Sequence, residues 1–491
     1  MSNIQKKLFT NIFILVLVNL LIKPFWTFGI DIKVLKIIGA ESYGFYYAVF
    51  NFTFLFHIFI DIGINQFHNR EIARTPEKLM LQYSQLLNLK LFFSFIYIII
   101  TFSVAYFYYG YEVLRFKLLL ILGVNQIIHS FILYNRANFT ALFKFKLDSF
   151  FSIFDKLLSI IIVAYIFYLS PIKNSLELDF KLEYFIYAQT FSLLVSLIFS
   201  TSILVFKENP KWQKLDLKIF IPYLKKTLPY AIAVLLMALY TRIDAVMIEK
   251  LLPETGDYQA GVYAAGYKIL DALNQIPYLF GLFIIPVFAK MLKHNENFKP
   301  IFFAALKILL SISIGFTIVS LFWGKDILQL LYKDLYRDTW YNSYILLVFS
   351  FNTAVLIYTT GGLLTANNNL IAISKMSIVC IVINIVLNYI FILKDGAAGA
   401  ALATLITQAS MAVMQIFLVL KLWKFKFAIK YFLYFFVYTL LLSISSYFLQ
   451  GNLLNIVIVV FLGIIVALAL NLVEWKIFLQ NKQLNKSLNS K

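Results

Sequence analysis

Four charged side chains lie inside two long apolar stretches within residues 240–290, at Arg242, Asp244, Lys268 and Asp271. Burying one charge at membrane depth costs about 3 kcal/mol or more, so such a group usually faces a cavity or a partner. Charges of this kind can hold ions and charged substrates by electrostatic attraction. We therefore expect this stretch to bind a substrate or a coupling ion.

Arg242 and Asp244 cannot form an ion pair within one helix, because two residues correspond to about 200° of helix rotation. We predict that Arg242 faces a substrate cavity. The alternative is an arginine that extends to the outer membrane interface. Asp244 lies toward the outer end of the same apolar stretch and is a candidate for ion coupling.

Lys268 and Asp271 are three residues apart and therefore share a helix face, which Asn274 and Gln275 continue by another turn. We predict that these four residues line a substrate cavity, because intramembrane charges are costly elsewhere. The alternative is a self-neutralising pair that packs between helices.

Lys23 lies in the middle of an apolar stretch and precedes Pro24. A proline frees backbone carbonyls, which a membrane tolerates only where protein or a cavity satisfies them. We predict that Lys23 binds a substrate phosphate or acts as a counter-ion. Lys90 and Lys307 lie nearer the starts of their helices, where a lysine can extend to the interface.

Three further polar side chains, Asp61, His57 and His129, lie in apolar stretches. Asp61 is a candidate for ion coupling, with an interfacial acid as the alternative. We predict that both histidines are neutral packing residues, and a proton relay is the alternative.

The sequence carries no pattern typical of covalent catalysis. It has four histidines and one cysteine, Cys380, without the spacing of a metal centre. A Walker loop and a Gly-x-Ser-x-Gly nucleophile motif are both missing from the sequence. We expect a protein that is not an enzyme, with no metal and no cofactor.

The composition indicates which structural elements hold these residues in place. The 491-residue chain is 61% hydrophobic and 14% charged, whereas about 25% of residues are charged in soluble domains. Apolar runs of about 20 residues recur, and each can cross a bilayer core. We predict an all-α polytopic membrane protein with about 14 transmembrane helices, at about 8–30, 43–65, 80–109, 116–139, 149–170, 184–206, 219–248, 261–289, 300–323, 341–365, 370–393, 396–421, 428–449 and 452–475.

Charge patterning predicts the topology. The net charge is +19, and most loop Lys and Arg fall on one side when the N-terminus is placed in the cytoplasm. Cytoplasmic loops gather such residues, so we predict that both termini are cytoplasmic. The basic charge then reflects topology and attraction to membrane lipid, and no nucleic-acid partner is expected.

Two regions half a chain apart resemble each other. Ile30-Asp31 matches Ile243-Asp244, and Gly44-Phe45-Tyr46-Tyr47-Ala48 matches Gly261-Val262-Tyr263-Ala264-Ala265. Each match opens a block of six predicted helices. Internal repeats of this kind are typical of transporters. By this pairing Asp31 is a further ion-coupling candidate, equivalent to Asp244.

These motifs resemble the MOP exporter superfamily. Two longer stretches carry the same resemblance, KPFWTFGIDIKVLKIIGAESYGFYYAVFNF at 23–52 and NIVLNYIFILKDGAAGAALATLI at 384–406. Within it the chain is most similar to the polysaccharide-biosynthesis branch, the flippases of lipid-linked O-antigen and capsule repeat units. The resemblance implies two six-helix lobes in a V around a cavity, with two extra C-terminal helices. We expect an N-terminal lobe at 1–206, a basic cytoplasmic linker at 207–226, a C-terminal lobe at 227–421 and two helices with a basic tail at 422–491.

The resemblance implies a flippase for a lipid-diphosphate-linked oligosaccharide in the bacterial inner membrane. Its expected substrate is an undecaprenyl-diphosphate-linked glycan, and its candidate partners are the polysaccharide polymerase and chain-length machinery. Three alternatives stay open: a cation-coupled multidrug exporter, a lipid II flippase and a membrane-embedded glycosyltransferase or polymerase. In the lipid II branch an Arg-Asp pair lies in the first helix, whereas here Ile30 precedes Asp31.

Overall fold

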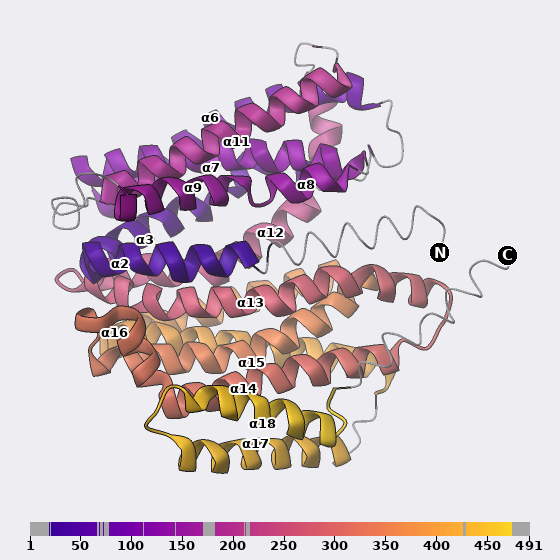
Figure 1. Cartoon of the computed structure of the whole chain (residues 1–491). Coiled ribbons are helices and arrows are strands. Elements are labelled where there is room, and N and C mark those ends of the chain that lie inside the picture. The colour runs from indigo at the N-terminus through magenta and orange to yellow at the C-terminus, as the bar shows by residue number, and fades with distance from the viewer. Residues whose placement is uncertain are drawn as a thin grey trace. The chain divides into compact units, whose positions relative to one another are not determined.

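In the computed structural model, all of the regular secondary structure in the described residues is helical (Figure 1). It describes residues 19, 21–65, 68, 72, 78–110, 112–142, 144–169, 182–210, 212, 217–425 and 429–473. Most of the predicted helix at 8–30, part of the predicted linker and both predicted cytoplasmic tails lie outside these residues.

The prediction of an all-α polytopic membrane protein is confirmed. All of the predicted apolar segments coincide, where described, with helices. In the described part of the chain, nine helices are long and apolar enough to cross a membrane. The chain forms two compact units, residues 7–261 (the first unit) and residues from 262 onward (the second unit). The lobe boundaries at 206, 226 and 421, and the V arrangement, stay predictions.

The first unit packs its helices in a few close pairs. Helix α11 packs against α7 and α9, α12 packs along α3, and α4 packs against α6. Helix α12 begins within the predicted linker, so part of that linker is regular helix. The elements are π-helix η1 (Trp26–Asp31), α2 (Ile32–Ile38), α3 (Ala40–Leu55), α4 (Ile58–Asp61), α6 (Lys78–Tyr109), α7 (Val113–Ala141), α8 (Phe145–Phe151), α9 (Phe154–Ala164), π-helix η2 (Tyr165–Leu169), α11 (Leu182–Glu208) and α12 (Leu217–Leu251).

In the second unit α15 packs against both α14 and α16, and the C-terminal pair α17 and α18 packs against α14 (Figure 1). Trp323 of α14 and Tyr438 of α17 lie in the apolar core of that contact. The elements are α13 (Gly256–Lys293), which starts in the first unit, α14 (Lys299–Tyr332), 3-10 helix η3 (Lys333–Leu335), α15 (Asp338–Ala366), α16 (Leu370–Trp423), α17 (Ile429–Leu449) and α18 (Asn455–Ala469).

Helix α16 contains two of the predicted segments, which meet at a kink. Gly396 has φ 53° and ψ −124° there, a conformation that glycine adopts more readily than other residues. Just beyond it, a side chain at Gly399 would lie 2.0 Å from the Phe391 carbonyl oxygen. These two glycines allow the chain to turn sharply between the segments 370–393 and 396–421.

Candidate substrate and ion sites

Asp31 is a buried carboxylate at the end of η1. Its side chain accepts a 2.5 Å hydrogen bond from the Tyr43 hydroxyl of α3, and Asp31 and Tyr43 are 2% and 0% exposed. A buried charge is costly unless it is hydrogen-bonded, so Tyr43 stabilises this carboxylate. The ion-coupling role of Asp31 stays a prediction.

Lys23 belongs to a group of charges that the structure brings together in the first unit. It interacts electrostatically with Arg136, Lys156 and Asp155. The ammonium of Lys156 lies 3.5 Å from Asp155 Oδ2 and 5.1 Å from the centre of the Trp26 ring. We call Lys23, Arg136 and Lys156 the basic cluster.

Two acids accompany the basic cluster. Arg136 Nε donates to Asp148 Oδ1 at 2.7 Å, and Asp155 contacts Lys156. Among the described residues, this region therefore places three cations together with the carboxylates of Asp148 and Asp155. Because Arg136 and Lys156 side chains are 24% and 36% exposed, the cluster is accessible to an anionic ligand.

Asp61 of α4 forms a buried ion pair with Lys90 of α6. Lys90 Nζ donates to Asp61 Oδ1 at 2.7 Å and to Ser130 Oγ of α7 at 2.8 Å. Lys90 is 0% exposed, so it pairs inside the protein and does not extend to the interface. Lys307 is also buried, and its ammonium donates to the Asn471 carbonyl at 3.5 Å.

Of the two predicted packing histidines, His57 lies beside this pair, and His129 lies next to His57 and interacts electrostatically with Asp155 and Lys156. The His57 and His129 ring centres are 6.4 Å apart, and His57 also interacts electrostatically with Asp61 and Lys90. His57 Nε2 is buried without a hydrogen-bond partner in the described structure. This juxtaposition keeps the proton-relay alternative open beside the packing role.

Arg242 and Asp244 occupy different environments on α12, as their spacing predicts. Asp244 is 1% exposed, whereas Arg242 is partly exposed and its guanidinium lies 5.4 Å from the centre of the Phe54 ring. A cation over an aromatic face is stabilised by the ring quadrupole. Ligand binding by Arg242 and ion coupling by Asp244 stay predictions.

The four candidates of α13, Lys268, Asp271, Asn274 and Gln275, lie in the second unit and are all partly exposed. Gln275 Nε2 donates to the Asp271 carbonyl at 3.5 Å. Asn274 Oδ1 is buried without a hydrogen-bond partner in the described structure. This amide oxygen is therefore available to a ligand or a water molecule, and the cavity-lining role stays a prediction.

Sequence reasoning missed a buried ion pair between Arg115 of α7 and Glu249 of α12. Arg115 Nη1 lies 2.7 Å from Glu249 Oε1, and Arg115 Nε lies 2.9 Å from Glu112 Oε2. The guanidinium also stacks on the rings of Phe45 and Tyr109, at 4.8 and 4.3 Å. Because Arg115 and Glu249 are far apart in the chain, their spacing gives no signal of the contact.

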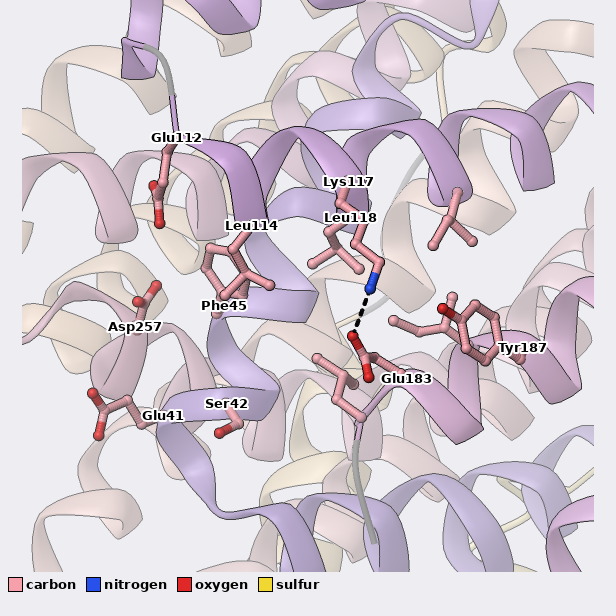
Figure 2. Close-up of a pocket in the computed structure, with 13 residues that line it drawn as sticks. Glu41, Ser42, Phe45, Glu112, Leu114, Lys117, Leu118, Glu183, Tyr187 and Asp257 are labelled. Carbon is pink, nitrogen blue, oxygen red and sulfur yellow. Dashed lines mark hydrogen bonds and ion pairs between the residues drawn. The ribbon is translucent and has the colours of Figure 1, made fainter.

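A cavity of about 540 Å³ lies between α3, α7 and α11, and Glu112, the other partner of Arg115, is one of its lining residues. Figure 2 shows the residues that line it. Glu41, Glu112 and Asp257 lie on one side of it, and Lys117 pairs with Glu183 on the other at 3.0 Å. Asp257 precedes the predicted membrane segment at 261–289. Burial raises the pKa of its carboxyl group, Arg115 opposes this, and Glu41 and Glu112 add to the increase.

A metal centre needs several His, Cys, Asp or Glu side chains close together. Among the described residues, no three His, Cys, Asp or Glu side chains gather into such a group. Cys380 is a buried free thiol.

Solved structures with the same fold are transporters of the MOP superfamily. The lipid II flippase MurJ, in an inward closed conformation, matches with a TM-score of 0.67 at 18% identity, over 98% of this chain and 100% of its own. The matched 98% of this chain includes most of α17 and α18. An inward-facing multidrug resistance MATE family transporter matches with a TM-score of 0.61 at 15% identity. The match covers 82% of this chain and 93% of the transporter. A MOP superfamily transporter from Pyrococcus furiosus matches with a TM-score of 0.53 at 14% identity. The match covers 83% of this chain and 94% of that transporter.

A family model described as "Polysaccharide biosynthesis protein" matches residues 8–292. No curated protein matches the sequence. The structural matches establish the fold, and the family model covers more than half of the chain. The family model confirms the resemblance to a polysaccharide-biosynthesis family over a range that includes the motif at 23–52, and the structural matches show the fold of MurJ and of MOP-superfamily MATE transporters. The chain is a member of the polysaccharide biosynthesis protein family.

Proposed function

We propose that the protein is a flippase that moves a lipid-diphosphate-linked oligosaccharide across the bacterial inner membrane for surface polysaccharide assembly. It acts by alternating access, with both termini in the cytoplasm. The family description and the MOP fold support a transporter in polysaccharide synthesis. The polysaccharide polymerase and chain-length machinery are its proposed partners.

The basic cluster is the observation that carries the choice of substrate. The Lys23 ammonium interacts with the Arg136 and Lys156 cations inside apolar helices, and those two cations each contact a carboxylate, Asp148 and Asp155 respectively. A diphosphate ligand brings negative charge to such a site, where electrostatic attraction is stronger than in bulk water. We propose that Lys23 contacts the diphosphate and that Arg136 and Lys156 support it.

The other candidate residues are assigned by their chemistry. Arg242, Lys268, Asp271, Asn274 and Gln275 are proposed to contact the substrate, through charge or through amide hydrogen bonds. Asp31, Asp61 and Asp244 are proposed to couple transport to an ion gradient.

Two alternatives are less well supported. A cation-coupled multidrug exporter needs an acidic substrate cavity, whereas the basic cluster brings three cations together. In the lipid II branch an arginine precedes the aspartate of the first helix. Here that position holds Ile30, which is 2% exposed, so it offers no cation to that substrate.

A gene deletion tests this proposal. Loss of the protein should remove surface polysaccharide and cause lipid-linked oligosaccharide to accumulate on the cytoplasmic side. The wild-type gene should restore the polysaccharide, and Lys23→Ala should not, at equal protein level. Lys325→Ala is the matched control, since Lys325 is an exposed lysine outside the basic cluster. Unchanged polysaccharide with altered drug resistance in the deletion strain would instead support the exporter.

A further inference from the structure

The cavity of Figure 2 has an apolar wall and a charged rim. One wall comes from α7 and α11, and its apolar residues are Leu114, Leu118, Ile121, Leu182 and Ile186. Phe45 and Tyr187 add aromatic surface. An apolar lining with a few polar groups is typical of a small-molecule site, and this lining fits an amphiphilic ligand.

The rim of the cavity carries more acidic than basic side chains. Glu41, Glu112, Glu183 and Asp257 line the cavity, and Lys117 is the lysine among its lining residues. Arg115, which pairs with Glu112, adds a second cation beside the cavity, so the four lining acids exceed these two cations by two, in contrast to the +19 charge of the whole chain. The carboxylates of Glu41, Glu112 and Asp257 lie on the side opposite the Lys117–Glu183 ion pair (Figure 2). The rim therefore offers carboxylates to a cation and one ammonium to an anion.

The cavity borders the apolar exterior of the helices that form it. Its lining residues Leu114 and Tyr187 are 58% and 45% exposed. Further along α7 and α11, Leu120 and Phe191 are 50% and 57% exposed. Such exposed apolar side chains on membrane helices face lipid, so a lipid tail can enter the cavity from the bilayer. In the proposed topology this end of α7 lies at the headgroups of the outer leaflet.

We propose that this cavity binds a phospholipid with a primary amine headgroup, such as phosphatidylethanolamine. Its ammonium donates hydrogen bonds to Glu41 and Asp257, its phosphate pairs with Lys117, and an acyl chain lies along the apolar wall. Phosphatidylcholine matches the charges, but its quaternary ammonium has no N–H to donate. Phosphatidylglycerol has no cation for the carboxylates. The inference uses the proposed topology but not the proposed glycan substrate.

Lipid retention by the full-length protein tests this inference. The protein is reconstituted in bilayers with equal amounts of phosphatidylethanolamine, phosphatidylcholine and phosphatidylglycerol, extracted in mild detergent, and its bound lipid measured by mass spectrometry. The wild-type protein should retain phosphatidylethanolamine preferentially. The double variant Glu41→Gln/Asp257→Asn should reduce this preference by about tenfold, because charge-assisted hydrogen bonds are lost. Glu254→Gln should keep it, since Glu254 is an exposed acid outside the cavity.

A second variant addresses the apolar wall. Ile121→Trp should fill the cavity and reduce retention of the lipid, while an unchanged unfolding midpoint shows that the protein stays folded. Equal retention of all three lipids by the wild-type protein would overturn the inference. So would a phosphatidylethanolamine preference that survives both the double variant and Ile121→Trp.

Discussion

Gly44 of α3 and Gly261 of α13 pack backbone against backbone. A β-carbon at Gly44 would lie 1.8 Å from the Asp257 carbonyl oxygen and 2.4 Å from the Gly261 nitrogen. A β-carbon at Gly261 would lie 1.9 Å from the Ala40 carbonyl oxygen. These are the two glycines that the internal repeat aligns, so equivalent positions of the repeat meet in space.

Gly44→Ala and Gly261→Ala should each destabilise the protein. Their helices must separate to admit one methyl group, and overpacking costs about 1–3 kcal/mol. The unfolding midpoint in detergent should fall for both variants. Gly123→Ala is the control, because its β-carbon would meet no atom closer than 3.8 Å. Equal midpoints for all three variants would show that the contact tolerates a side chain.

The Arg115–Glu249 ion pair should be strongly coupled. Replacing Arg115 alone leaves a buried carboxylate without its cation and should cost about 3 kcal/mol. The double variant Arg115→Met/Glu249→Met should cost less than the sum of the single variants, as a double-mutant cycle of unfolding midpoints can show. Lys117→Ala, which breaks an exposed pair with Glu183, should have no measurable effect. Additive losses from Arg115 and Glu249 would contradict the coupling.

Removing Asp61 should disturb α6 more than removing both members of its ion pair. Asp61→Asn leaves the Lys90 ammonium buried and uncompensated, whereas Asp61→Asn/Lys90→Met removes the charge. Hydrogen exchange measured by mass spectrometry should show faster exchange in α6 for the single variant and partial recovery for the double variant. Ser130→Ala should have a smaller effect, since it removes one hydrogen bond worth about 1 kcal/mol. Faster exchange in the double variant than in Asp61→Asn would exclude this explanation.

Asp257 should make stability depend on pH. Its pKa is raised by burial and by neighbouring carboxylates, so the folded state holds this proton more tightly than the unfolded state. Deprotonation therefore destabilises the folded state, and stability should fall as pH rises through the raised pKa. Asp257→Asn should raise the unfolding midpoint at pH 7 and lose this advantage near pH 4, about the pKa of an unperturbed Asp. A stability gain that is the same at both pH values would contradict the assignment.

The sequence predicts the helices well because membrane helices have a strong and local signal. Runs of about 20 apolar residues mark each of them, and even the break at Gly396 falls between two predicted segments. The repeat also has a local signal, since its short motifs align directly. The Gly44–Gly261 contact could not be predicted from the sequence, because no residue pattern indicates which of the equivalent positions meet in the folded protein.

The charged sites were only partly predictable. Lys23 and Arg242 stand out because a charge in an apolar run is costly, and the same reasoning applied to the segment 149–170 would have indicated Lys156. The partners could not be predicted, because Lys90 and Asp61, like Arg115 and Glu249, come from different helices. Loop position alone makes Arg115 look like an interfacial residue.

Reconstituted transport tests the central claim most directly. Purified protein in sealed vesicles is supplied with an undecaprenyl-diphosphate-linked glycan on one side, and its appearance on the other side is followed with a membrane-impermeant probe. Wild-type protein and Lys325→Ala should translocate it, whereas Lys23→Ala and Lys156→Ala should be slower by at least about tenfold, equivalent to about 1.4 kcal/mol. Failure of the wild-type protein to move this lipid, or wild-type rates in both basic-cluster variants, would contradict the account.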